Sequence, residues 1–165
     1  MDKEAEAMLQ ALEEEEFIQS LELKPKEQWY CDFCGGIINS ADDGMLEWDK
    51  IFEEEGIKAQ NFRIVHHRSI KECTRPKEAD AKLADMHLYR FTGDHGLSDL
   101  INLGILNKVD NFELGTIIRR IHVKYYEEAW RLLPLALEDG HYEVNSNEDG
   151  NVTEDVLKWL IKKYR

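Results

Sequence analysis

The sequence lacks a long apolar run, and it has few prolines and only three cysteines. A membrane-spanning helix needs about 20 consecutive apolar residues, so we expect no membrane association. An odd number of cysteines cannot pair completely into disulfides. The first residues also lack the basic start and apolar centre of a secretion signal. These absences together predict a protein of the reducing cytoplasm.

Basic residues are also scarce, since 21 lysines and arginines face 34 aspartates and glutamates, for a net charge of -13. Phosphate binding relies on a basic surface, so direct nucleic-acid binding is disfavoured and we expect a protein partner. The charge is unevenly spread. Residues 1–28 hold nine acids and three lysines, a net -6, whereas the last eight residues are basic. A local basic groove for nucleic acid therefore stays open.

The composition, with 42% hydrophobic and 10% aromatic residues in 165, is that of a folded chain of about one domain. We predict an α+β fold in which a small β-rich zinc knuckle packs on a mainly helical body. Residues 1–28 would form an acidic amphipathic helical arm and linker. Residues 29–75 would form the β-rich zinc-binding knuckle, and residues 76–165 the helical body.

The arm is predicted to be a helix from residue 2 to about residue 22, with its acidic side chains opposite one apolar face. The apolar residues expected to share that face are Met8, Leu9, Leu12, Phe17, Ile18 and Leu21. Pro25 cannot continue a helix and disfavours helix in the residue before it. The helix should therefore end before Lys24-Pro25-Lys26.

Two segments of the knuckle, 44–48 (GMLEW) and 61–67 (NFRIVHH), have the aromatic and β-branched content of strands. The acidic stretch 51–60 between them predicts a loop or one helical turn. After Cys73, Pro76 can open a helix that runs to about Arg90. The remainder reads as helices, including a long or bent one from Phe112 to Leu137 and a terminal one capped by Thr153.

The strongest motif is the run CDFCGG, in which Cys31 and Cys34 are three positions apart on a turn. Two thiolates at this spacing can bind one Zn²⁺, and Cys73 with one histidine would complete a closed Cys₃His site. Adjacent strand residues point to opposite faces, so only one of His66 and His67 should reach the ion. We favour His67 and keep His66 as the alternative. Four protein ligands leave no position for water, so such a zinc would be structural.

The competing interpretation is that these histidines belong to a metal-dependent nuclease of the HNH type. His67 would act as general base, and His87 or His95 would bind a hydrolytic metal ion from a following helix. The sequence departs from that pattern, because it has no second CxxC pair and no asparagine between His67 and His87. The acidic balance of the chain is also unfavourable for a nuclease.

Four stretches together resemble uncharacterised CxxC…VHH…C proteins of Bacillus-like bacteria and their phages or prophages. They are CDFCGGIIN, GMLEW, FRIVHHRS with Cys73, and DMHLYRFTGDHGLSDL. The resemblance covers about residues 29–130. It implies a bacterial cytoplasmic or phage setting and no known activity, and it supports treating Cys31, Cys34, His67 and Cys73 as one unit.

These features predict a non-enzymatic, zinc-stabilised binding or regulatory protein, such as a phage- or prophage-type inhibitor or adaptor of a host protein. The HNH-like nuclease is one alternative. The other is an acidic decoy, in which the helix at residues 4–22 occupies the basic groove of a nucleic-acid enzyme and inhibits it.

Overall fold

The computed structural model describes residues 2–75, 82–141 and 153–165. It confirms the α+β class, because the helices are accompanied by two antiparallel sheets of two and three strands. Within these residues, no helix is both long enough and apolar enough to cross a membrane.

The larger sheet has the strand order β4-β3-β5 and is antiparallel throughout. Its strands are β3 (Gly44–Glu53), β4 (Gly56–His66) and β5 (Leu83–His87). The loop or helical turn predicted at 51–60 is wrong, because β3 and β4 pair as a hairpin as far as Glu53 and Gly56. Phe52 faces Ile57 across this pair, and such apolar cross-strand pairs stabilise a hairpin. The acidic residues left over form only its tip.

The helix predicted from Pro76 to Arg90 is also wrong where the structure describes it. Residues 76–81 lie outside the described residues, and β5 occupies Leu83–His87. A 3₁₀ helix, η3 (Leu88–Phe91), follows the strand and buries Leu88 and Phe91. Pairing with β3 and burial of these two side chains override the local helical pattern. The last residue of β5, His87, lies opposite Met45 of β3.

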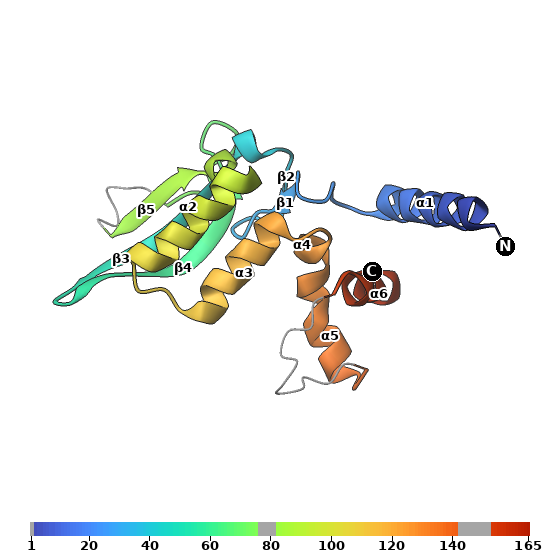
Figure 1. Ribbon diagram of the computed structural model, residues 1–165. Helices are drawn as coiled ribbons and strands as arrows, with labels where there is room; N and C mark the ends of the chain where they lie inside the picture. The colour runs from blue at the N-terminus through green and yellow to red at the C-terminus, as the bar shows by residue number, and fades with distance from the viewer. Residues whose placement is uncertain (1, 76–81, 142–152) are drawn as a thin grey trace.

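Helices α2 (Gly93–Leu106) and α3 (Asn111–His122) cover one face of this sheet (Figure 1). They enclose a first hydrophobic core, the sheet core, to which a small sheet of β1 (Trp29–Tyr30) and β2 (Ile37–Ile38) contributes Trp29 and Ile38. Its other fully buried side chains include Leu46, Ile64, Leu88, Leu100 and Ile121. The sheet core therefore joins residues on both sides of the boundary predicted at residue 75.

A second hydrophobic core, the helical core, is built from short helices near the C-terminus. They are α4 (Tyr126–Ala129), η4 (Trp130–Leu132), α5 (Leu133–Glu138) and α6 (Glu154–Tyr164). The helix predicted from Phe112 to Leu137 is thus broken, first at Tyr125, whose φ is +70°, and then at α5, which has a proline in its first turn. The predicted cap is confirmed, since the Thr153 side chain accepts a hydrogen bond from the N–H of Val156.

Helix α1 (Lys3–Ser20) forms where it was predicted and ends before Pro25, but its apolar residues do not share one face. Phe17 is buried in the helical core, whereas Met8, Leu9 and Leu12 are 69%, 49% and 55% exposed. Met8 and Phe17 are nine residues apart, which is about 2.5 turns at 3.6 residues per turn. They therefore lie on opposite sides of the helix, and the prediction of a single apolar face is wrong.

The C-terminal end of α1 and the following linker are held by α4. Glu128 accepts hydrogen bonds from the N–H groups of Glu22 and Leu23, and it forms a 3.0 Å ion pair with Arg165 at the end of the chain. Arg165 also donates to the carbonyl of Ser20. The N-terminal end of α1 projects from the body (Figure 1).

Candidate metal centre

The CxxC segment folds into a tight knuckle between β1 and β2. The N–H of Cys31 donates to the carbonyl of Gly36 at 2.8 Å, and the N–H of Gly35 donates to the carbonyl of Cys31 at 2.9 Å. Gly35 adopts a φ of +73°, a left-handed conformation that glycine takes without strain. The N–H of Gly36 then points at the sulfur of Cys34, at 3.4 Å. The turn thus presents both thiols on one side.

Asp32, between the two cysteines, attaches this knuckle to the end of β4. Its N–H donates to the carbonyl of Ile64, and its carboxylate accepts the N–H of Ile64, both at 2.8 Å. This reciprocal pair extends the sheet hydrogen bonding onto the knuckle. As a result the cysteines lie beside the last residue of β4, His66.

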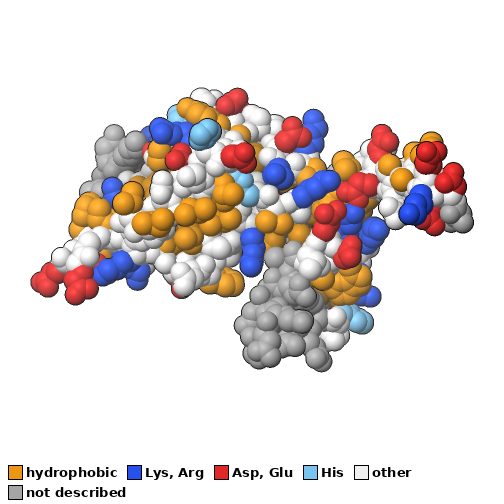
Figure 2. Space-filling model, in the orientation of Figure 1, with side chains coloured by type: hydrophobic (Ala, Val, Ile, Leu, Met, Phe, Trp, Pro, Cys, Tyr) orange, Lys and Arg blue, Asp and Glu red, His pale blue; other side chains and the backbone are white. Residues whose placement is uncertain are grey.

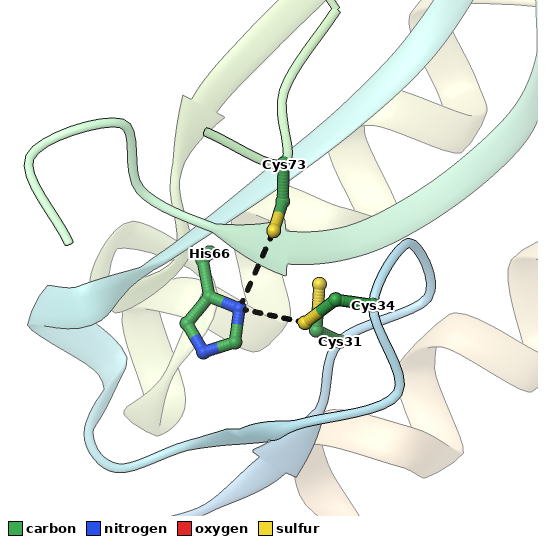
Figure 3. Close-up of side chains that lie close together, drawn as sticks. All are labelled: Cys31, Cys34, His66 and Cys73. Carbon is green, nitrogen blue, oxygen red and sulfur yellow. Dashed lines mark hydrogen bonds between the residues drawn. The ribbon is translucent and has the colours of Figure 1, made fainter. Parts of the chain in front are cut away.

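Four ligand atoms gather at this point, from Cys31, Cys34, His66 and Cys73, and all lie within 4.8 Å of one another (Figure 3). His66 Nδ1 is 3.5 Å from the Cys34 sulfur and 3.7 Å from the Cys73 sulfur. A tetrahedral zinc with Zn–S near 2.3 Å and Zn–N near 2.0 Å would hold sulfur and nitrogen about 3.5 Å apart. The side chains are therefore spaced as ligands of one metal ion would be.

The second ring nitrogen of His66 supports the same interpretation. His66 Nε2 is 3.1 Å from the carbonyl oxygen of Ile37, and because a carbonyl can only accept, Nε2 must carry the hydrogen. Nδ1 then presents its lone pair to the thiols. Histidines that bind metals commonly fix their orientation and tautomer by donating the other N–H in this way. The ring is buried, so water does not compete for this arrangement.

The three thiols are free of disulfides, and Cys34 and Cys73 differ in their readiness to ionise. Burial opposes ionisation of Cys34, but the N–H of Gly36 and the neighbouring thiols outweigh it and lower its pKa to about 6. Burial, together with Cys31 and Cys34, raises the pKa of Cys73 to about 12. One thiolate is therefore ready at neutral pH. Ionisation of Cys73 beside it requires a cation to offset the burial and the mutual repulsion.

The structure brings His66, the alternative ligand, into the cluster with the three cysteines, and not the favoured His67. His67 follows the end of β4, where its Nδ1 contacts the Ser69 hydroxyl at 2.7 Å and accepts the N–H of Ser69 at 3.1 Å. Its ring stacks on His87 with centroids 4.9 Å apart. The sequence did contain a signal against His67 as the ligand, because the serine two residues later can hydrogen-bond with it in a local turn.

The histidines of the nuclease alternative are arranged differently from its expectation. His87 closes a strand rather than lying on a helix after His67, and His95 is exposed in the first turn of α2. Across the three described ranges, the Cys₃His cluster is the one group of histidine, cysteine and carboxylate side chains whose ligand atoms converge closely enough for a metal ion.

A buried arginine, whose burial the sequence did not predict, connects the knuckle to the helices. Arg120 of α3 is only 3% exposed; it binds both carboxylate oxygens of Glu127, at 2.7 and 2.8 Å, and Asp32 at 2.7 Å. Burial alone would lower the pKa of the guanidinium, but these two carboxylates outweigh it and raise the pKa. Arg120 lies three residues after buried Ile117, so its place on the apolar stripe of α3 was the available signal.

No protein-family model, curated protein or solved structure matches this chain. The function is therefore inferred from the chemistry of the site and of the surface.

Proposed function

We propose that the chain is a non-enzymatic, zinc-stabilised binding or regulatory protein of the cytoplasm. The observation that carries the proposal is the closed donor set of three thiols and one imidazole nitrogen. Sulfur-rich, four-donor sites favour zinc over the hard cations that prefer oxygen ligands. With four protein ligands around it, zinc has no open position for water, so its role is structural.

The position of the cluster explains what a structural zinc would do here. Its ligands come from three separate segments: the β1–β2 turn, the end of β4, and the loop that carries Cys73. The small sheet has only two residues in each strand, which is too short to be stable alone. Zinc would tie this sheet and the loop to β4, leaving the helices and α1 to present a surface to a partner protein.

The bacterial or phage setting implied by the resemblance makes a host protein the proposed partner. An inhibitor or adaptor of this kind acts by occupying a surface, so it needs a stable scaffold rather than a reaction centre. The net charge of -13 favours a partner with a basic surface, through long-range electrostatic attraction.

The test compares two neighbouring histidines. Metal analysis of the purified protein should find about one zinc per chain, and His66→Ala should lose most of it. His67→Ala is the matched control, because it removes the same side chain one residue away and should retain the zinc. Co²⁺ substitution should give the strong absorption of tetrahedral thiolate coordination in wild type and in His67→Ala.

Wild-type protein without zinc, or zinc retained in His66→Ala and lost in His67→Ala, would refute the proposed centre. The nuclease alternative has its own assay, the nicking of plasmid DNA with added Mg²⁺ or Mn²⁺. We expect no nicking. Nicking that disappears in His67→Ala would replace the proposal with the enzyme.

A further inference from the structure

Helix α1 has two apolar faces, and only one of them contacts the rest of the chain. The unpartnered face is a stripe of Ala5, Met8, Leu9 and Leu12, whose spacing of i, i+3, i+4 and i+7 places them on one side of a helix. Its three large side chains are 49% to 69% exposed. Met8 lies opposite Phe17, and Ala5 and Leu12 lie about 120° and 140° from it around the helix, so the centre of the stripe points away from the surface on which α1 docks.

The docked face shows what kind of surface this helix binds. The Phe17 ring meets Tyr125 edge to face at 5.2 Å, and the ammonium groups of Lys158 and Lys162 lie 5.6 and 5.3 Å from its centroid. Glu14 accepts hydrogen bonds from Lys158, Lys124 and the Tyr125 hydroxyl. Phe17 and the neighbouring Glu14 thus bind a surface that is apolar and has lysines around it.

The exposed stripe repeats this pattern without a partner. At 3.6 residues per turn, Glu4 and Glu15 border one side of the stripe, and Glu6 and Glu13 border the other. None of these four carboxylates forms an ion pair with another described residue. Acidic (red) and hydrophobic (orange) side chains accordingly gather on the projecting helix in Figure 2.

The charges bordering the stripe decide between possible occupants. A second copy of α1 would bring glutamates against glutamates, and like charges that face each other are unfavourable. Anionic lipid surfaces and nucleic acid would repel the same residues. An apolar groove with lysines or arginines on both rims would satisfy the stripe and its borders together.

We propose that the Ala5–Leu12 stripe of α1 docks into an apolar groove with basic rims on a partner protein. This proposal rests on the proposed binding function and names the surface and the partner chemistry. The helix is already formed before binding, with the Asp2 side chain capping it at the N–H of Glu4. A preformed helix has less conformational entropy to lose when it enters a groove.

The test uses the full chain and a synthetic helical hairpin whose two helices form a leucine-lined groove with lysines on both rims. The stripe variant, Met8→Gln/Leu9→Gln/Leu12→Gln, removes the apolar side chains while keeping good helix formers. The matched control, Ile101→Gln/Ile105→Gln/Leu106→Gln, makes three equivalent changes at exposed positions of α2. A second hairpin with glutamates on its rims tests the charge requirement.

We expect the lysine hairpin to bind wild type and the α2 control alike, with affinity that falls as salt is added. The stripe variant should bind at least about tenfold more weakly, since buried apolar anchors carry most of such binding energy. Hydrogen–deuterium exchange should show protection of residues 3–12 in the complex. The glutamate hairpin should not bind.

Binding that is unchanged in the stripe variant, or equal binding of the glutamate hairpin, would overturn the proposal. Sedimentation equilibrium showing a wild-type dimer that dissociates in the stripe variant would instead assign the stripe to a second copy. Stripe-dependent binding to phosphatidylcholine–phosphatidylserine vesicles would assign it to a membrane. Zinc measured in the same preparations keeps failure of the metal centre separate, because none of the four ligands of the cluster lies in α1.

Discussion

Different kinds of interaction lie at the borders of the sheet core and of the helical core. The sheet core is bordered by the Cys₃His cluster and is connected to the helices through buried Arg120. The helical core has no such cluster among the described residues, and carboxylate–lysine and carboxylate–arginine pairs lie at its edges instead. One core therefore depends on a proposed metal ion and a buried network, and the other on apolar packing and more exposed ion pairs.

We expect chelation to produce the largest difference between the two cores, measured as protection from hydrogen–deuterium exchange. Removing zinc from a site that ties together short segments removes folding free energy directly, so β1, β2 and the loop at Cys73 should lose protection from hydrogen–deuterium exchange. Helix α6 should keep most of its protection, because its core contacts do not involve the cluster. Cys73→Ser should reproduce the effect without chelator. Uniform loss of protection along the chain would show that the cores unfold as one unit.

Replacing the buried arginine should have the next largest effect. Arg120→Met keeps much of the side-chain volume but leaves Glu127 and Asp32 without their cation, and breaking such a pair costs about 3–5 kcal/mol. The matched control is Arg131→Met, which removes a more exposed 3.3 Å contact with Asp32 and should cost no more than about 1 kcal/mol. Urea unfolding measures both. Equal losses of unfolding free energy in the two variants would show that burial does not determine how much each ion pair contributes.

Arg120 shows what local sequence patterns can and cannot reveal. The CxxC spacing, the position of α1 and the Thr153 cap follow from short-range rules, and the structure agrees with them. Arg120 sits in a run with Arg119 and looks like part of a basic surface. Its burial depends on Glu127, placed by the break at Tyr125, and on Asp32, placed by the knuckle. Neither neighbour can be identified from local spacing.

The histidine ligand and the missed strand have the same explanation. His66 and His67 are equivalent by composition, and only the position of the knuckle against Ile64 selects His66. Leu83–His87 becomes a strand because β3 offers a free edge on the side away from β4. Tertiary pairing therefore decides these two features, whereas the helix and turn signals act within a few residues.

Truncating Phe17 should affect only the helical core and its contact with α1. Phe17→Ala removes a ring packed against Tyr125, but lysine side chains rather than core atoms cover part of it. We expect a loss of about 2–3 kcal/mol, at or below the range for a fully enclosed phenylalanine, and faster hydrogen exchange in residues 13–20. Leu12→Ala on the exposed face should change stability by no more than about 0.5 kcal/mol. A comparable loss in both variants would contradict the two-faced helix.

Acid should weaken the docking of α1 on the helical core, with a smaller effect on stability than chelation, Arg120→Met or Phe17→Ala. Hydrogen bonds from Lys158 and then Tyr125 lower the pKa of Glu14 from 4.5 to about 2, against the opposing effect of burial. A carboxyl group whose pKa is lower in the folded state contributes its stability above the unfolded pKa and loses it as pH falls through the folded one. The contribution should therefore be complete above about pH 4.5 and fade towards pH 2.

The contribution of the Glu14 carboxylate to stability should stay below about 1 kcal/mol, because the carboxylate remains partly exposed to solvent and salt. Hydrogen exchange of residues 13–20, compared between pH 5 and pH 3 after correction for the intrinsic rate, measures the weakening of docking. Glu14→Gln should weaken docking at pH 5 and remove most of the difference between the two pH values. Glu15→Gln is the control, since Glu15 has no lysine partner among the described residues and should behave as wild type. If Glu14→Gln kept the full pH dependence, the ion pairs of Glu14 with Lys158 and Lys124 would not be what attaches α1 to the helical core, and the comparison of the two cores would fail at this point.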